Sequence, residues 1–193
     1  MTIPLNINNL TVEQWIKFEQ AKTEPEPNLA ILRALLGLSY DEVNNMPLNK
    51  LNKLIFRVQV LRGQSPRIKR NKAIWIGFKR FKGYSNLCAN QFTALDTFKM
   101  PEHMANACAV CYGRGKFDGD KVNEYSLLFA KQKIGKVYGQ VFFCTNVYKK
   151  LKEDLKQSLA TAKLTILEHL KEISQTMPVS DEIMDGIMSL TSL

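Results

Sequence analysis

Two cysteines separated by two residues are the most chemically suggestive pair in this 193-residue chain. Cys108 and Cys111 have the spacing with which paired thiolates hold one side of a tetrahedral zinc ion. A complete site needs two more ligands, for which the candidates are Cys88, Cys144 and His103, and none of these lies in a second pair of the same spacing. A redox role has less support, because no strand–helix–strand pattern surrounds the pair.

The eight residues from Cys108 to Gly115 match, letter for letter, the CxxCxGxG pattern of zinc-binding J-domain co-chaperones. That family carries four such repeats, two for each metal ion, whereas this chain carries one. An internal repeat, described below, places both cysteines on apolar positions of a helix, where cysteine acts as a small hydrophobic residue. We therefore expect buried thiols, with no metal and no cofactor.

Other fragments of known motifs are incomplete. The segment 113–116 lacks the spacing of a P-loop, and the segment 118–120 lacks the remaining ligands of a calcium loop. Neither His103 nor His169 has an evident catalytic partner, and no matched pair of carboxylates stands out. The sequence therefore predicts a protein with no catalytic residues and no enzymatic activity.

The positive charge of the chain is concentrated in one segment. The formal net charge is +9, and residues 61–82 carry eight basic residues and no acidic one. Such a cluster attracts phosphates or an acidic protein surface, but it equally suits a solvated hairpin whose charges prevent edge-to-edge pairing. We expect one of Ile74, Trp75 and Ile76 to face the helices. The candidate contacts, which we expect to be exposed, are Arg67, Lys69, Arg70, Lys72, Lys79, Arg80 and Lys82.

A diverged internal repeat with an offset of 77 residues organises the chain. Residues 10–18 and 87–95 share a leucine, a glutamine, an aromatic residue and a large apolar residue in the same order, and each copy continues to a glycine. A helical unit that cannot bury its apolar face alone can bury it against its copy. We expect residues 10–37 and 87–113 to form matching helix pairs. In these pairs, Trp15 and Phe92 should occupy equivalent buried places.

Local signals place the remaining elements of the first two thirds of the chain. Capping-box patterns at residues 11–14 and 39–42 predict helix starts. Residues 73–78 are rich in β-branched and aromatic side chains and predict a β-hairpin, and residues 3–7 are expected to form a short strand.

The last third of the chain is predicted to be helical. Residues 134–143 are apolar and contain two glycines, which permit close helix packing, and residues 148–173 predict a long amphipathic helix. Pro178 ends it, and residues 180–190 predict a helix about three turns long that needs a packing partner. This C-terminal helix would pack either on the core of its own chain or on a neighbouring surface. Its candidate contacts are Ile183, Met184, Ile187, Met188 and Leu190.

The predicted fold is mainly α with a small β-hairpin. Two diverged helical repeats are joined by a basic hairpin and followed by a long amphipathic helix. No apolar run reaches the roughly 20 residues of a membrane helix, and the first residues lack a signal-peptide pattern, so we expect an intracellular or particle-packaged protein. The predicted parts are an N-terminal helical module (1–62), a basic hairpin connector (63–86), a second helical module (87–145), and a long helix with a short C-terminal helix (146–193).

Several segments resemble small bacteriophage structural and assembly proteins. Residues 87–95, 103–112 and 137–143 resemble that group's T-x-x-Q-[FYW]-x-x-[FL] helix start, A-x-x-Y helix and G-x-x-x-F-F helix. Residues 32–48 are similar to the ILTGxSxEEVxxLPL segment of phage tail-assembly chaperones. Where the group often has Arg-Pro after the tyrosine, this chain has Gly-Arg-Gly at residues 113–115, so that loop is expected to differ.

The resemblance implies a non-enzymatic virion structural protein that acts through protein–protein contacts. It would serve as an oligomeric ring or adaptor, or as a packaged component, near the portal and tail. The implied partners are portal, ring or tail proteins, further copies of the chain and, through the basic segment, DNA, with no membrane. The implied location is the virion, and the host cytoplasm during assembly. Two alternatives stay open: a tail-assembly chaperone that is not retained in the virion, and a zinc-dependent nucleic-acid-binding module.

Overall fold

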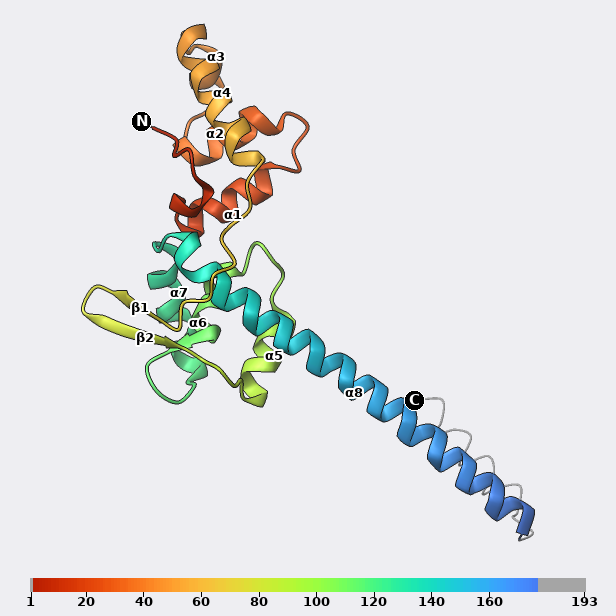
Figure 1. Ribbon diagram of the computed structural model, residues 1–193. Coiled ribbons are helices and arrows are strands. Elements are labelled where there is room, and N and C mark those ends of the chain that lie inside the picture. The colour runs from red at the N-terminus through yellow and green to blue at the C-terminus, as the bar shows by residue number, and fades with distance from the viewer. Residues whose placement is uncertain (1, 177–193) are drawn as a thin grey trace. The chain divides into compact units, whose positions relative to one another are not determined.

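The computed structural model describes residues 2–176 and is mainly helical, with one small antiparallel sheet (Figure 1). This confirms the predicted fold class. The chain divides into two compact units, Met1–Asn146 and Val147–Leu193, and each is described by itself. Within the described residues, none of the helices combines the length and the apolar character that crossing a membrane requires.

The N-terminal part of the larger unit is a set of short helices. Capping boxes at Thr11 and Ser39 start two of them, and Gly37 ends another in the left-handed conformation with φ 66°. The strand expected at residues 3–7 is not formed, because the side chain of Asn6 accepts a hydrogen bond from the backbone of Asn8 and starts a 3-10 helix instead. The elements are η1 (Ile7–Asn9), α1 (Val12–Ala21), α2 (Pro27–Leu36), α3 (Tyr40–Asn44) and α4 (Leu48–Arg62).

The predicted hairpin is present and gains a third strand. Strands β1 (Ala73–Ile76) and β2 (Lys79–Gly83) pair antiparallel, and β3 (Tyr112–Gly113) pairs with β2 on its other side. The pair Lys82↔Gly113 joins the basic connector to the end of the second helical module. The sheet therefore brings together two segments that are about 30 residues apart in the sequence.

The internal repeat is visible in the positions of the helices. Helices α5 (Ala89–Thr97) and α6 (Met104–Cys111) begin 77 residues after α1 and α2, respectively. The side chain of Gln91 accepts from the backbone of Cys88 at 2.9 Å, as the side chain of Gln14 accepts from that of Thr11 at 3.0 Å. The two copies thus start their helices in the same way.

The copies differ in which side chains they bury and in how they end. Trp15 is buried, but Phe92 is only half-buried, so the expected equivalence of the two aromatic residues is wrong. Gln91 is turned inward instead, and its amide donates to the carbonyl of Val110 at 2.7 Å. In the first copy, Gly37 caps the end of the second helix, whereas in the second copy the corresponding residues form β3.

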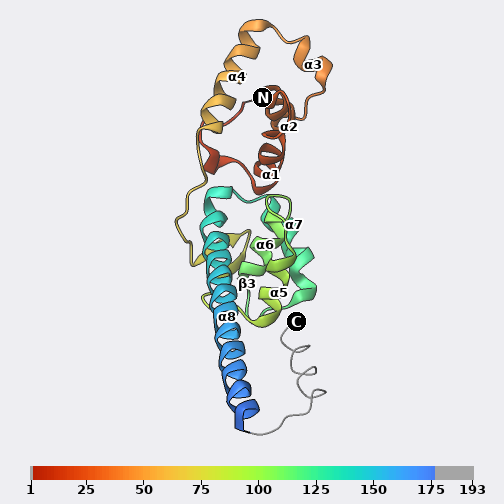
Figure 2. The ribbon, with the colours of Figure 1, turned by 90° about the vertical axis from the view of Figure 1, so that its right-hand side faces the viewer.

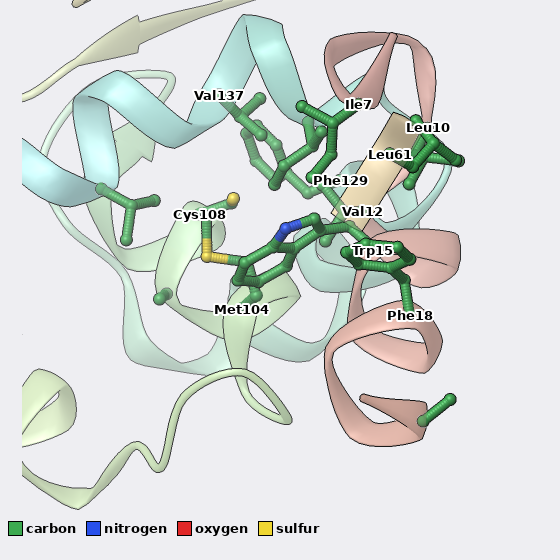
Figure 3. Close-up of a cluster of buried hydrophobic side chains, with 14 of the residues drawn as sticks. Ile7, Leu10, Val12, Trp15, Phe18, Leu61, Met104, Cys108, Phe129 and Val137 are labelled. Atoms are coloured by element: carbon green, nitrogen blue, oxygen red, sulfur yellow. The ribbon is translucent and has the colours of Figure 1, made fainter. Parts of the chain in front are cut away.

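The two copies share one core. Figure 3 shows the indole of Trp15, from α1, pointing toward Met104 and Cys108 of α6, with Phe129 and Val137 nearby. Phe129 belongs to α7 (Val122–Ala130), which follows the short helix η2 (Gly119–Lys121), and Val137 belongs to α8 (Ile134–Thr176). Figure 2 shows α5, α6 and α7 beside the first turns of α8. The helical modules and the hairpin connector therefore lie within a single compact unit.

Helix α8 is longer than predicted. It begins at Ile134 and runs without interruption to Thr176, so the apolar stretch 134–143 and the amphipathic stretch 148–173 are one helix. Gly139 lies where a Cβ atom would overlap the backbone carbonyl of Lys69, so the connector can run directly against the helix. Within the smaller unit, every residue from 149 to 166 is exposed. The predicted contacts of the C-terminal helix, Ile183, Met184, Ile187, Met188 and Leu190, lie outside the described residues.

Candidate functional site

The outer face of the β1–β2 hairpin carries an aromatic side chain among basic ones. The register pairs Trp75 with Arg80, and Lys82 lies two residues further along on the same face. The opposite face carries the pair Ile74↔Phe81, and both of these side chains are buried. Trp75 is 63% exposed, so the hairpin presents an indole beside two cations to solvent.

The inner face fixes the hairpin to the helical core. The ring of Phe81 meets the rings of Tyr125 and Phe129 edge to face, with centroids 5.0 Å and 5.3 Å apart. Such pairs contribute about 0.5–1.5 kcal/mol each beyond their burial. The basic face is therefore carried by a strand pair that is anchored on α7 and not by a free loop.

A cleft of about 630 Å³ opens at the end of β2. It is lined by residues 80–86, apart from Phe81, and by the loop 113–115. Three basic side chains, those of Arg80, Lys82 and Arg114, line it, and no acidic residue does. Uncompensated positive charge in a concave surface attracts anions, because the walls focus the field.

Two glycines and a tyrosine hold the walls of the cleft together. The hydroxyl of Tyr84 donates to the carbonyl of Gly115 at 3.1 Å, and burial raises the pKa of this tyrosine. A Cβ atom at Gly113 would overlap the Tyr84 hydroxyl, so the close approach of the two loops requires glycine there. Gly115 has φ +147°, a conformation that favours glycine.

Arg70 does not line the cleft, although it contacts the backbone of Tyr84, which does. Its Nε atom donates to the side chain of Gln140 at 2.8 Å, and a terminal nitrogen donates to the carbonyl of Tyr84 at 3.2 Å. The guanidinium lies 3.7 Å from the ring centroid of Phe143. The prediction that Arg70 is largely exposed is therefore wrong, because its contacts with the buried amide of Gln140 and the ring of Phe143 hold it inward.

The other predicted basic contacts are exposed, as expected, but only two of them line the cleft. Arg80 and Lys82 do so, whereas Lys79 lies 3.6 Å from a carboxylate oxygen of Glu124. Sequence reasoning missed Arg114, which strand pairing brings beside Lys82. The remaining predicted contacts, Arg67, Lys69 and Lys72, are exposed and do not line the cleft either.

The paired cysteines are buried in the core. Cys108 and Cys111 are both fully buried, and burial raises the pKa of each thiol, which disfavours the thiolate that zinc requires. A hydrogen bond with Cys111 lowers the pKa of Cys144, which is also buried. Among the described residues, no three His, Cys, Asp or Glu side chains converge as a metal site needs.

Thiol titration of the native protein tests this burial. With an aromatic disulfide reagent, we expect one fast-reacting thiol, because Cys88 is exposed and the three other cysteines are buried. The remaining three thiols should react only as the protein unfolds in denaturant. The variant Cys88→Ser should lose the fast phase, and a second fast thiol in native protein would contradict the packing described for α6.

Comparisons with known proteins leave the site to be interpreted from its own geometry. No protein-family model, curated protein or solved structure matches this chain at a significant level. The functional interpretation therefore depends on the residues of the cleft, the hairpin and α8.

Proposed function

We propose that this chain is a non-enzymatic bacteriophage structural protein that contacts nucleic acid through the cleft and the outer face of the hairpin. The observation that carries the proposal is the convergence of Arg80, Lys82 and Arg114 around a cleft with no acidic residue. Phosphates of a nucleic-acid backbone neutralise such a site and release bound counterions, which drives binding. The resemblance of residues 32–48 and 87–112 to phage structural and assembly proteins supports the virion setting.

The position of Trp75 favours a single strand over a duplex. An exposed indole beside Arg80 and Lys82 offers one stacking surface next to two phosphate contacts. Proteins that bind single strands combine a basic groove with aromatic side chains on which bases stack. A duplex keeps its bases stacked internally, so it would use only the charges of the site.

The two alternatives to this proposal are judged by different observations. The zinc-dependent nucleic-acid-binding module is disfavoured, because Cys108 and Cys111 are fully buried and burial raises the pKa of each thiol. The tail-assembly chaperone differs from the structural protein in whether the chain is retained in the particle.

Binding of a labelled oligonucleotide to the whole protein tests the proposal. We expect saturable binding of a 20-nucleotide single strand in fluorescence anisotropy, weakening with salt at a log–log slope of about −2, because three phosphate contacts contribute about 0.7 each. A duplex of the same length should bind more weakly. Lack of binding at low salt, or binding that is insensitive to salt, would overturn the nucleic-acid assignment.

Mass spectrometry of purified phage particles separates the structural protein from the chaperone. A structural protein should be found in particles at a fixed ratio to the other particle proteins. Detection in infected cells together with absence from particles would overturn the structural assignment in favour of the chaperone.

A further inference from the structure

The exposed part of α8 carries an apolar stripe that follows an eleven-residue repeat. Leu151, Leu155, Leu159, Ala162 and Ile166 follow one another at intervals of four, four, three and four residues. The interval from Leu151 to Ala162 and that from Leu155 to Ile166 are both eleven residues. Eleven residues in three turns keep a stripe on one face of a nearly straight helix, because 3.67 residues per turn is close to the α-helical value.

The apolar stripe is exposed to solvent in the structure. The four large aliphatic side chains Leu151, Leu155, Leu159 and Ile166 are 48–65% exposed. Upstream in α8, the same spacing passes through Val137, Gln140 and Cys144, all of which are buried in the larger unit. Residues at this spacing are therefore packed in the first part of α8. The same spacing continues into the second part, where no described residue covers the apolar side chains.

We infer that this part of α8 pairs with the same part of a second copy of the chain, antiparallel, with Ala162 near the crossing point. The stripe is nearly self-complementary when reversed. On the N-terminal side of Ala162, Leu151, Leu155 and Leu159 lie eleven, seven and three residues away, and on the C-terminal side Ile173, Leu170 and Ile166 lie eleven, eight and four residues away. A small residue at the centre lets two helices approach closely. A two-fold axis there brings Leu159 of one copy against Ile166 of the other.

The charges of the helix favour the antiparallel arrangement. Residues 149–163 carry five lysines and two acidic residues, net +3, whereas residues 164–176 carry one lysine and two acidic residues, net −1. A parallel pair would place the two lysine-rich halves side by side and repel. In the antiparallel pair, each lysine-rich half lies along the acidic half of its partner.

A second copy matches the stripe better than the chain's own C-terminal segment does. From residue 151 to residue 173 the stripe is about 33 Å long, at 1.5 Å per residue. The fifteen residues after Pro178 would cover at most about 22 Å as a helix. A second copy of α8 has the full length and the matching spacing. This association involves neither the cleft nor nucleic acid, so it stands or falls independently of the proposed function.

Light scattering of the full-length protein without nucleic acid tests the pairing. We expect a dimer at about 10 µM, and the variant Leu159→Glu should raise the dissociation constant by about 100-fold or more, because a carboxylate placed in an apolar interface loses its hydration. Leu164→Glu is the matched control, since Leu164 is 61% exposed but lies on the opposite side of the helix from the stripe. A monomeric wild type, or equal weakening by both substitutions, would overturn the inference.

Disulfide trapping tests the orientation. In a Cys88→Ser background, a mixture of Leu155→Cys and Leu170→Cys proteins should form a crosslinked heterodimer, while each variant alone should not crosslink through α8. Crosslinking of each variant with itself would show a parallel pair and contradict the antiparallel one. Deletion of residues 177–193 should leave the dimer intact. If the full chain is monomeric and only the deletion dimerises, the C-terminal segment is the occupant and the inference fails.

Discussion

Replacing Arg80, Lys82 and Arg114 together with glutamine is expected to weaken single-strand binding by about 100-fold at low salt, because three phosphate contacts are lost. All three side chains line the same cleft, and glutamine keeps much of their length and polarity. The salt dependence of the affinity should also become weaker, since the three removed cations are the groups that displace counterions from the phosphates. Anisotropy titrations of the variant at three salt concentrations measure both effects.

The matched control removes the same charge elsewhere. Lys50, Lys53 and Lys131 are exposed and lie outside the cleft, so their replacement by glutamine should change the affinity less than about threefold, through the general field alone. If this control loses as much affinity as the cleft variant, binding follows net charge and the cleft is not a site.

The variant Gly139→Ala is expected to lower the free energy of unfolding by about 2 kcal/mol or more, because the added methyl group is forced into a packed backbone. Its Cβ atom would overlap the carbonyl of Lys69, and this carbonyl has little room to retreat. The connector beyond it is held by Asn71, whose side chain donates to the carbonyl of Lys136 at 2.6 Å and whose own carbonyl accepts from Tyr112. Chemical denaturation measures the loss.

Helix propensity alone predicts the opposite sign for this change. Within a helix, alanine is about 1 kcal/mol more favourable than glycine, so a stabilised Gly139→Ala protein would contradict the close contact between connector and helix. Gly119→Ala serves as the control, because no atom lies within 4 Å of a Cβ atom placed there. Its unfolding free energy should change by less than about 0.5 kcal/mol.

The sequence predicts best those features that depend on neighbouring residues. Helices α1 and α3 begin where their capping residues indicate, since a capping box is made entirely within four residues. The hairpin follows from the β-branched and aromatic residues of 73–78. The continuity of α8 was missed, because two glycines lower helix propensity, while their close contacts with the connector and with Asn8 are invisible in the local sequence.

Two of the three cations that line the cleft could be predicted, and the third depended on long-range pairing. Arg80 and Lys82 stand out as part of the basic segment, but Arg114 joins them only because Lys82 pairs with Gly113 in the sheet. Arg70 cannot be distinguished from the neighbouring cations in the sequence, and its contacts with Gln140 and Phe143, about 70 residues away, set it apart. Composition therefore located the positive charge, whereas the sheet register and one buried amide decided which cations face the cleft.

The two tryptophans of the chain give the protein a pair of built-in optical reporters. Trp15 is 6% exposed in the shared core, so its emission should be blue-shifted and shielded from iodide, whereas Trp75, on the hairpin, should emit to the red and be readily quenched. Unfolding changes the first signal, and occupation of the hairpin face changes the second. One unlabelled sample therefore reports the integrity of the core and the state of the basic surface at the same time, and Trp75→Phe isolates the core signal.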